Sequence, residues 1–238
     1  MRFMQFSRLH LYMLVIGIGF TLLYATTWGE TANTKGDEDD FEKLLEQEEK
    51  ARQVNEGKLV FLAKPPEKPV HHQQNHVILI ASSLLDGWVQ LIQCHHHLDA
   101  MSRVEVVYKK DTTRKLRVKS SKNIERVWVE DSSVQLSNVK DHAELCVEVE
   151  SKALTIRGDG TYYLRHGPFM RKFLDGYYPM RVSVDVELPA QQLILSDTFP
   201  MRQQGYKVWE TANAVHVDAW FEGRLYTEFV FKTALKKN

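Results

Sequence analysis

The sequence has few cysteines, no excess charge of either sign and none of the short motifs that mark common enzyme sites. Only two of its 238 residues are cysteine, so paired CxxC metal motifs are absent. The formal net charge is zero, which gives no general attraction to nucleic acid, and no nucleic-acid partner is expected. GxSxG, P-loop, GxGxxG and HExxH patterns are also missing. We therefore predict that the protein is not an enzyme.

Long hydrophobic runs are scarce, and one lies near the N-terminus, at residues 11–28. It is close to the roughly 17–25 residues of a membrane-spanning helix and longer than the roughly 7–15 of a signal-peptide core. Arg2 and Arg8 precede it and an acidic block follows, which places the N-terminus in the cytoplasm. We expect residues 1–30 to be a single-pass signal anchor in the inner membrane, or else a cleaved signal peptide. In either case the remainder lies in the periplasm.

Residues 31–57 are expected to be an acidic helical linker. Nine acidic residues lie between Asp37 and Gly57 against three basic ones. The first four acidic positions provide helix-capping candidates, and Gly57 suits the end of a helix. The apolar stripe is thin, so a solvated spacer fits better than a core helix.

Residues 58–238 are expected to form one β domain. Short segments of alternating or β-branched residues follow one another, separated by polar turns. Residues 88–98 and 181–188 are two such segments, and residues 214–232 resemble a hairpin turning near Glu222-Gly223. Residues 168–176 are the one expected helix, with Pro168 in its first turn and Gly176 at its end. The pattern predicts an antiparallel β-sandwich, immunoglobulin-like or similar.

The two cysteines are expected to form a disulfide, because thiols in an oxidising compartment usually pair. Alternation along residues 88–98 groups Cys94 with Trp88, Ile92 and His96, which favours that side as the core face. Alternation along residues 143–150 instead groups Cys146 with two glutamates. A β-bulge, or a strand covered on both faces, would reconcile the two positions.

Histidines are concentrated between residues 71 and 97, where six of the ten lie. His95 and His97 are two residues apart on one strand, which is close enough to chelate one ion. Zinc or copper needs further ligands, and these could come from the segment after the prolines if it pairs with this strand. The candidate metal ligands are therefore His95, His97, His71, His72 and His76, with solvated or hydrogen-bonded histidines as the alternative.

Basic and aromatic residues are mixed in "RHGPFMRKFLDGYYPM", which follows residue 164. Such a mixture is typical either of an element that caps the end of a sandwich or of a patch that recognises an anionic ligand. The candidate patch consists of Arg165, His166, Arg171, Lys172, Tyr177 and Tyr178.

The runs "KPVHHQQNHVIL", "SLLDGWVQLIQCHHHLD", "GPFMRKFLDGYYPM" and "DAWFEGRLYTEF" resemble segments of uncharacterised exported or membrane-anchored proteobacterial proteins. That resemblance implies an envelope location and no particular activity. We expect a non-enzymatic envelope protein whose sandwich binds another envelope protein or an anionic ligand, or supports a membrane-associated assembly. The alternative is a periplasmic protein that binds zinc or copper through its histidines.

Overall fold

The computed structural model describes residues 55–190 and 192–234. These residues belong to one compact unit that begins at Gln47. The expected membrane anchor and residues 31–54 of the expected linker lie outside the described residues, so both stay predictions. Within the described residues, no helix is long and apolar enough to cross a membrane.

Strands make up most of the domain, as the sequence predicts. The only helical elements in the described ranges are α2 (Ser83–Asp86) and the 3-10 turn η1 (Lys110–Thr112). The strands are β1 (Val60–Phe61), β2 (His72–Ile78), β3 (Trp88–Leu98), β4 (Met101–Val107), β5 (Thr113–Glu130), β6 (Ser133–Lys152), β7 (Leu154–Ile156), β8 (Thr161–Phe169), β9 (Arg171–Phe173), β10 (Gly176–Tyr178), β11 (Met180–Glu187), β12 (Leu193–Phe199), β13 (Tyr206–Glu210), β14 (Ala214–Glu222) and β15 (Leu225–Thr233).

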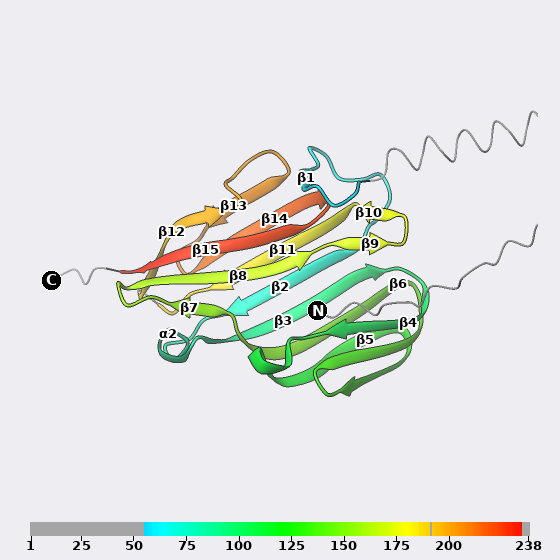
Figure 1. Cartoon of the computed structure of the whole chain (residues 1–238), viewed down its shortest axis with the longest axis horizontal. Helices are drawn as coiled ribbons and strands as arrows, with labels where there is room; N and C mark the ends of the chain where they lie inside the picture. The colour runs from blue at the N-terminus through cyan, green and yellow to red at the C-terminus, as the bar shows by residue number, and fades with distance from the viewer. Residues whose placement is uncertain (1–54, 191, 235–238) are drawn as a thin grey trace, which may run out of the picture. The chain divides into compact units, whose positions relative to one another are not determined.

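Two sheets pack face to face around the main hydrophobic core (Figure 1). The larger has nine strands in the order β1-β14-β11-β2-β3-β6-β4, with β13 also paired to β14 and β5 to β6. The smaller has the order β12-β15-β8-β7. The expectation of a wholly antiparallel domain is wrong in one place, because β2 and β11 run parallel. The predicted alternation of β11 is confirmed, since Val182, Val184 and Val186 are buried in this core.

A long bent ribbon extends the larger sheet and encloses a second core. β3 and β4 lie end to end along one side of β6, and β5 lies along its other side. β3, β5 and β6 each carry left-handed residues near the bend, and bulges bend and twist a sheet. These residues are His97, Asn123, Asn138 and His142, with φ between 51° and 59°. The second core consists of Val134, Leu136, Val139, Ala143, Leu145 and Val147.

Two expectations about single elements are wrong. Residues 168–176 form no helix, because β8 continues to Phe169 and is followed by the small β9–β10 hairpin. The expected hairpin at Glu222-Gly223 does not form either, because β14 belongs to the larger sheet and β15 to the smaller. Gly223 allows this crossing: its φ is +88°, and a Cβ there would lie 2.1 Å from the carbonyl oxygen of Lys58.

Cys94 and Cys146 are direct partners in the β3–β6 register. Their Cα atoms are 4.1 Å apart and their sulfur atoms are at bonding distance, 2.08 Å, so the expected pairing is seen. The expected core face of β3 is wrong, because Val89, Leu91, Gln93 and His95 are the buried residues. Residues directly opposite on neighbouring strands point to the same side of a sheet. The outward position of Cys146 therefore sets that of Cys94, and no bulge at the cysteines is needed.

We predict that the double variant Cys94→Ala/Cys146→Ala is less stable than the oxidised protein. The bridge joins residues 52 positions apart, for which the loss of loop entropy in the unfolded chain corresponds to roughly 4 kcal/mol. Guanidinium unfolding of both proteins measures the difference. Reduced wild-type protein is the control and should behave like the variant; equal stability of all three would contradict the prediction.

Candidate functional site

The five histidines predicted as metal ligands do not converge on one site. Strand alternation sends His71 and His95 to the inner face of the larger sheet, and sends His72 and His76 to its outer face. His97 lies at the ribbon bend and contacts His142 instead. Among the residues that the structure describes, no group of three or more His, Cys, Asp or Glu side chains is placed to hold a metal ion.

His71 and His95 begin a buried chain of hydrogen bonds on the inner face. His71 Nε2 lies 3.0 Å from His95 Nδ1, and His95 Nε2 lies 3.3 Å from Gln93 Oε1. An amide oxygen only accepts, so His95 carries its proton on Nε2, and its Nδ1 accepts a hydrogen bond from His71. The Gln93 amide then donates to Asn75 Oδ1 over 3.0 Å, and Tyr108 donates to Gln93 Oε1 over 2.8 Å.

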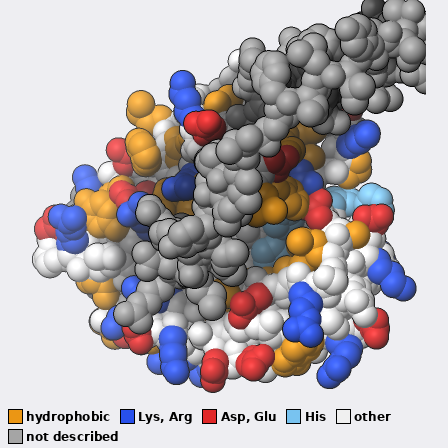
Figure 2. All heavy atoms as spheres, turned by 45° about the vertical axis from the view of Figure 1, so that its right-hand side comes forward, with side chains coloured by type: hydrophobic (Ala, Val, Ile, Leu, Met, Phe, Trp, Pro, Cys, Tyr) orange, Lys and Arg blue, Asp and Glu red, His pale blue; other side chains and the backbone are white. Residues whose placement is uncertain are grey.

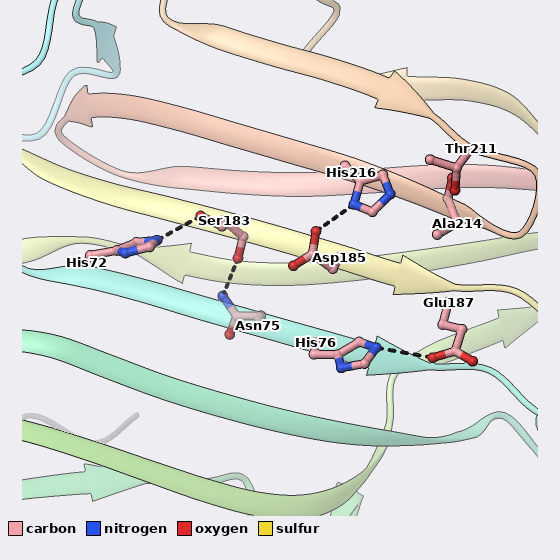
Figure 3. A network of polar contacts seen from close by, with 9 residues as sticks. All are labelled: His72, Asn75, His76, Ser183, Asp185, Glu187, Thr211, Ala214 and His216. Carbon is pink, nitrogen blue, oxygen red and sulfur yellow. Dashed lines mark hydrogen bonds and ion pairs between the residues drawn. The ribbon is translucent and has the colours of Figure 1, made fainter.

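This chain ends on β11, where the Asn75 side chain donates to the backbone carbonyl of Ser183 over 3.3 Å (Figure 3). In each of the hydrogen bonds between His71 and β11 the donor is therefore on the His71 side and the acceptor is on the β11 side, and all the groups are neutral. Burial lowers the pKa of His95 to about 3 and the pKa of His71 to about 4, although the Asp99 carboxylate acts on His71 in the opposite sense. The arrangement holds β2, β3 and β11 together and leaves no strong base exposed.

The outer face of the larger sheet carries three separate histidine contacts (Figure 3). His72 Nε2 lies 2.7 Å from Ser183 Oγ, His76 Nε2 lies 3.2 Å from Glu187, and His216 Nδ1 lies 2.6 Å from Asp185. Burial and the nearby Arg181 lower the pKa of His72 to about 4. His72 is thus a weak base for activating Ser183.

The six residues predicted as an anionic ligand patch are also divided. His166 is buried in the sandwich, and its Nε2 has no hydrogen-bond partner within the described part of the chain. Arg171 makes two hydrogen bonds to Asp99, at 3.0 and 2.6 Å. Its charge is therefore already paired.

The other members of the predicted patch form contacts at the β9–β10 end of the domain. Lys172 lies over the ring of Tyr177, with 5.4 Å from Nζ to the centroid, and Tyr178 bonds to Asp175. Arg224 donates to the Tyr177 hydroxyl over 2.5 Å. Hydrophobic side chains lie among Lys, Arg, Asp and Glu side chains on the face turned forward in Figure 2.

A pocket of about 340 Å³, which the sequence did not predict, joins this region to the edge of the sandwich. Its lining residues come from three segments and are Leu59, Phe61, Phe199, Pro200, Met201, Gln203, Arg224 and Tyr226. Phe199 and Met201 are 67% and 72% exposed, which is unusual for large apolar side chains with a core available. Arg165 of the predicted patch lies over the Tyr226 ring, 4.5 Å from its centroid. The clearest sequence signal was the apolar "FPM" run at the end of β12.

Two glycines let the chain segment around β1 close one side of the pocket. A Cβ at Gly223 would lie 2.1 Å from the Lys58 carbonyl oxygen, and a Cβ at Gly205 would lie 2.5 Å from that of Leu62. Both glycines have left-handed φ angles, +88° and +78°, which residues with a side chain adopt at a cost. The wall formed by Leu59 and Phe61 depends on these two positions.

Comparison with known proteins gives little further guidance. No family model matches the chain, and no curated protein matches it. A mutant M1 zinc metallopeptidase from Deinococcus radiodurans, bound to a Tyr-Ser-Ala substrate, has a TM-score of 0.41 and 11% identity, over 75% of this chain and 43% of that one. A two-domain M1 zinc metallopeptidase bound to L-tryptophan has a TM-score of 0.37 and 12% identity, over 75% and 44%. The chain spans less than half of these proteins, and the likeness is too weak to carry an argument about function.

We predict that Gly205→Ala and Gly223→Ala each destabilise the domain by at least about 1 kcal/mol, because a Cβ would collide with backbone and the left-handed φ would be strained. Urea unfolding measures the change. Gly158→Ala is the matched control, since nothing lies within 4 Å of its Cβ position. Equal effects at all three positions would show that the collisions are not the cause.

We also predict that acid destabilises the fold through its buried neutral histidines. Burial lowers the pKa of His71, His72 and His166 to about 4 and that of His95 to about 3. Below about pH 6.5 the unfolded chain binds protons at these sites and the folded chain does not, so stability falls toward pH 4. Above pH 6.5 these four residues add no pH dependence.

Urea unfolding at a series of pH values tests this expectation. His95 and His166, the most buried of the four, should each contribute a slope of up to about 1.4 kcal/mol per pH unit. His166→Phe should flatten the profile between pH 6.5 and 4, since it removes one of these protons. A profile that stays level across this range in the wild type would be the contrary result.

Proposed function

We propose that the protein is a non-enzymatic binding protein of a bacterial envelope, held in the inner membrane by residues 11–28 with its β domain in the periplasm. The apolar N-terminal run supports the location, and so does the cysteine pair at bonding distance. The observation that carries the binding role is the pocket beside β1, where exposed apolar side chains surround a space of about 340 Å³.

The lining of the pocket suggests the class of ligand. Leu59, Phe61, Phe199 and Met201 provide apolar contact, and Arg224 is the one charged residue among the lining side chains. An apolar group gains free energy on leaving water, and a guanidinium binds a carboxylate or phosphate. The pocket therefore fits an apolar chain attached to an anionic group.

The pocket is also formed in part by the first residues that the structure describes. Tyr177, which accepts a hydrogen bond from Arg224, pairs with Asn55 through its backbone. Leu59 and Phe61 follow within a few residues and form one wall. A ligand in the pocket would thus contact the segment that leads to the expected linker and membrane anchor.

A metal-handling role has less support. Its five candidate histidines are divided between two sheet faces and the ribbon bend, and His71, His72, His76 and His95 each already have at least one ring nitrogen hydrogen-bonded to a protein group.

We predict that dodecanoate binds to the domain from Gln47 onward, and that dodecyltrimethylammonium, with the same chain and the opposite charge, binds at least tenfold more weakly. The difference should arise from the Arg224 guanidinium. Isothermal titration below the critical micelle concentration measures both affinities.

Matched variants separate charge from packing in this test. Arg224→Gln should remove the preference for the anion, whereas Tyr177→Phe removes the hydrogen bond to Arg224 and should keep the preference. Arg114→Gln is the distant control, since Arg114 lies over Trp88 and pairs with Glu150. If Arg224→Gln and Arg114→Gln bind both amphiphiles like the wild type, the pocket is not the anion site.

A further inference from the structure

His97 and His142 come from different strands and meet at the ribbon bend. Their Nδ1 atoms are 3.4 Å apart, and their rings are nearly perpendicular, with an interplanar angle of 88°. Both residues are exposed. Histidine side chains are visible at the surface on the face drawn in Figure 2.

The backbone at both histidines is left-handed, with φ 55° at His97 and 56° at His142. Residues other than glycine rarely adopt this conformation, which costs roughly 1–2 kcal/mol. The β3–β6 register shifts between His95 and Leu98, next to this pair. Such irregularities change the direction in which side chains point. Here they bring together two imidazoles that lie 45 residues apart in the sequence.

The separation of the two nitrogens matches two ligands of one metal ion. With metal–nitrogen distances of about 2.0–2.1 Å, the ligands of a tetrahedral ion lie about 3.3 Å apart. The structure gives 3.4 Å between the two Nδ1 atoms. Water can complete the coordination, because the pair faces solvent.

The other histidine contacts of the described chain do not offer this arrangement. His71 and His95 belong to the buried neutral chain, in which His95 uses both ring nitrogens. His72, His76 and His216 each place a ring nitrogen against a hydroxyl or a carboxylate. The His72 ring also lies beside that of His96, with centroids 5.7 Å apart, but its Nε2 is bonded to Ser183 Oγ. The His97–His142 pair alone among these contacts combines two imidazoles with exposure to water.

We propose that His97 and His142 form a surface site for a late first-row divalent cation, binding through their Nδ1 atoms with water as the remaining ligands. Cu(II) is preferred over Zn(II), since nitrogen sites follow that order of affinity. The site is independent of the apolar pocket, and either can fail without the other.

Titration of the full chain in a nonionic detergent, oxidised at Cys94 and Cys146, tests the site. Cu(II) is added as its glycine complex to suppress weak binding, and calorimetry gives stoichiometry and affinity. We expect one Cu(II) per chain, a weaker affinity for Zn(II), and at least a tenfold loss of Cu(II) affinity in His97→Asn and in His142→Asn. Cu(II) should also raise the thermal midpoint of the wild type and not of these variants.

Asparagine is chosen because it accepts a left-handed φ more readily than most residues, so the variants remove the imidazole with little added strain. If either fails to fold, glycine at the same position replaces it. His76→Asn is the matched control for a surface histidine on the sheet face and should bind like the wild type. Unchanged affinity in both site variants, or an equal loss in His76→Asn, would show adventitious binding only and would overturn the proposal.

Discussion

The continuous pairing of β6 is the constraint on which the rest of the structure depends. This strand, Ser133–Lys152, is paired along both sides, with β3 and β4 on one side and β5 on the other. Its inward residues contribute to both hydrophobic cores: Val149 packs in the sandwich, and Leu145 and Val147 pack in the ribbon. Its outward residues include Cys146. They also include Glu148 and Glu150, which form ion pairs with Arg and Lys side chains of β5. Breaking this strand would separate the two cores.

A polar chain lies inside the larger sheet, between β2 and β3, where an apolar interior would be expected. Asn75, Gln93 and His95 are buried, and the energetic cost of burying them is offset because their amide and imidazole groups are hydrogen-bonded to one another. Tyr108, which bonds to Gln93, packs against both cores. This series of side-chain hydrogen bonds therefore links the strands at the place where the sandwich and the ribbon join.

Strand positions were largely predictable from the sequence, because alternation and turn residues are local signals. Residues 88–98 are β3 with the expected bounds, and β11 has the expected buried face. The buried face of β3 was not predictable, since both faces carry apolar residues: Trp, Ile and Cys on one side, and Val and Leu beside Gln and His on the other. The neighbouring strands decide that face. Pro168 and Gly176 suit a helix start and stop, yet they are equally compatible with the strand and hairpin that form.

The site residues were predicted less well than the fold, because they depend on contacts between distant segments. His97 was identified, whereas His142 lies 45 residues away and has no local pattern to link the two. The pocket is lined by residues from both ends of the domain, so no single stretch of sequence predicts it. Strand alternation already indicates that the neighbours His71 and His72 point to opposite sides of the sheet, so the five candidate histidines could not all face one ion.

The pairing of β1 with β14 and of β2 with β11 sets an order for the assembly of the domain. Val60 pairs with Glu222, and His72 pairs with Arg181, so the first contact cannot form before residue 222 is available and the second cannot form before residue 181. β3, β4, β5 and β6 are consecutive and, apart from the pairing of β3 with β2, they pair only with one another. Closing their shorter loops costs less entropy. Because a chain is synthesised from its N-terminus onward, the ribbon can fold before the last strands of the sandwich are available.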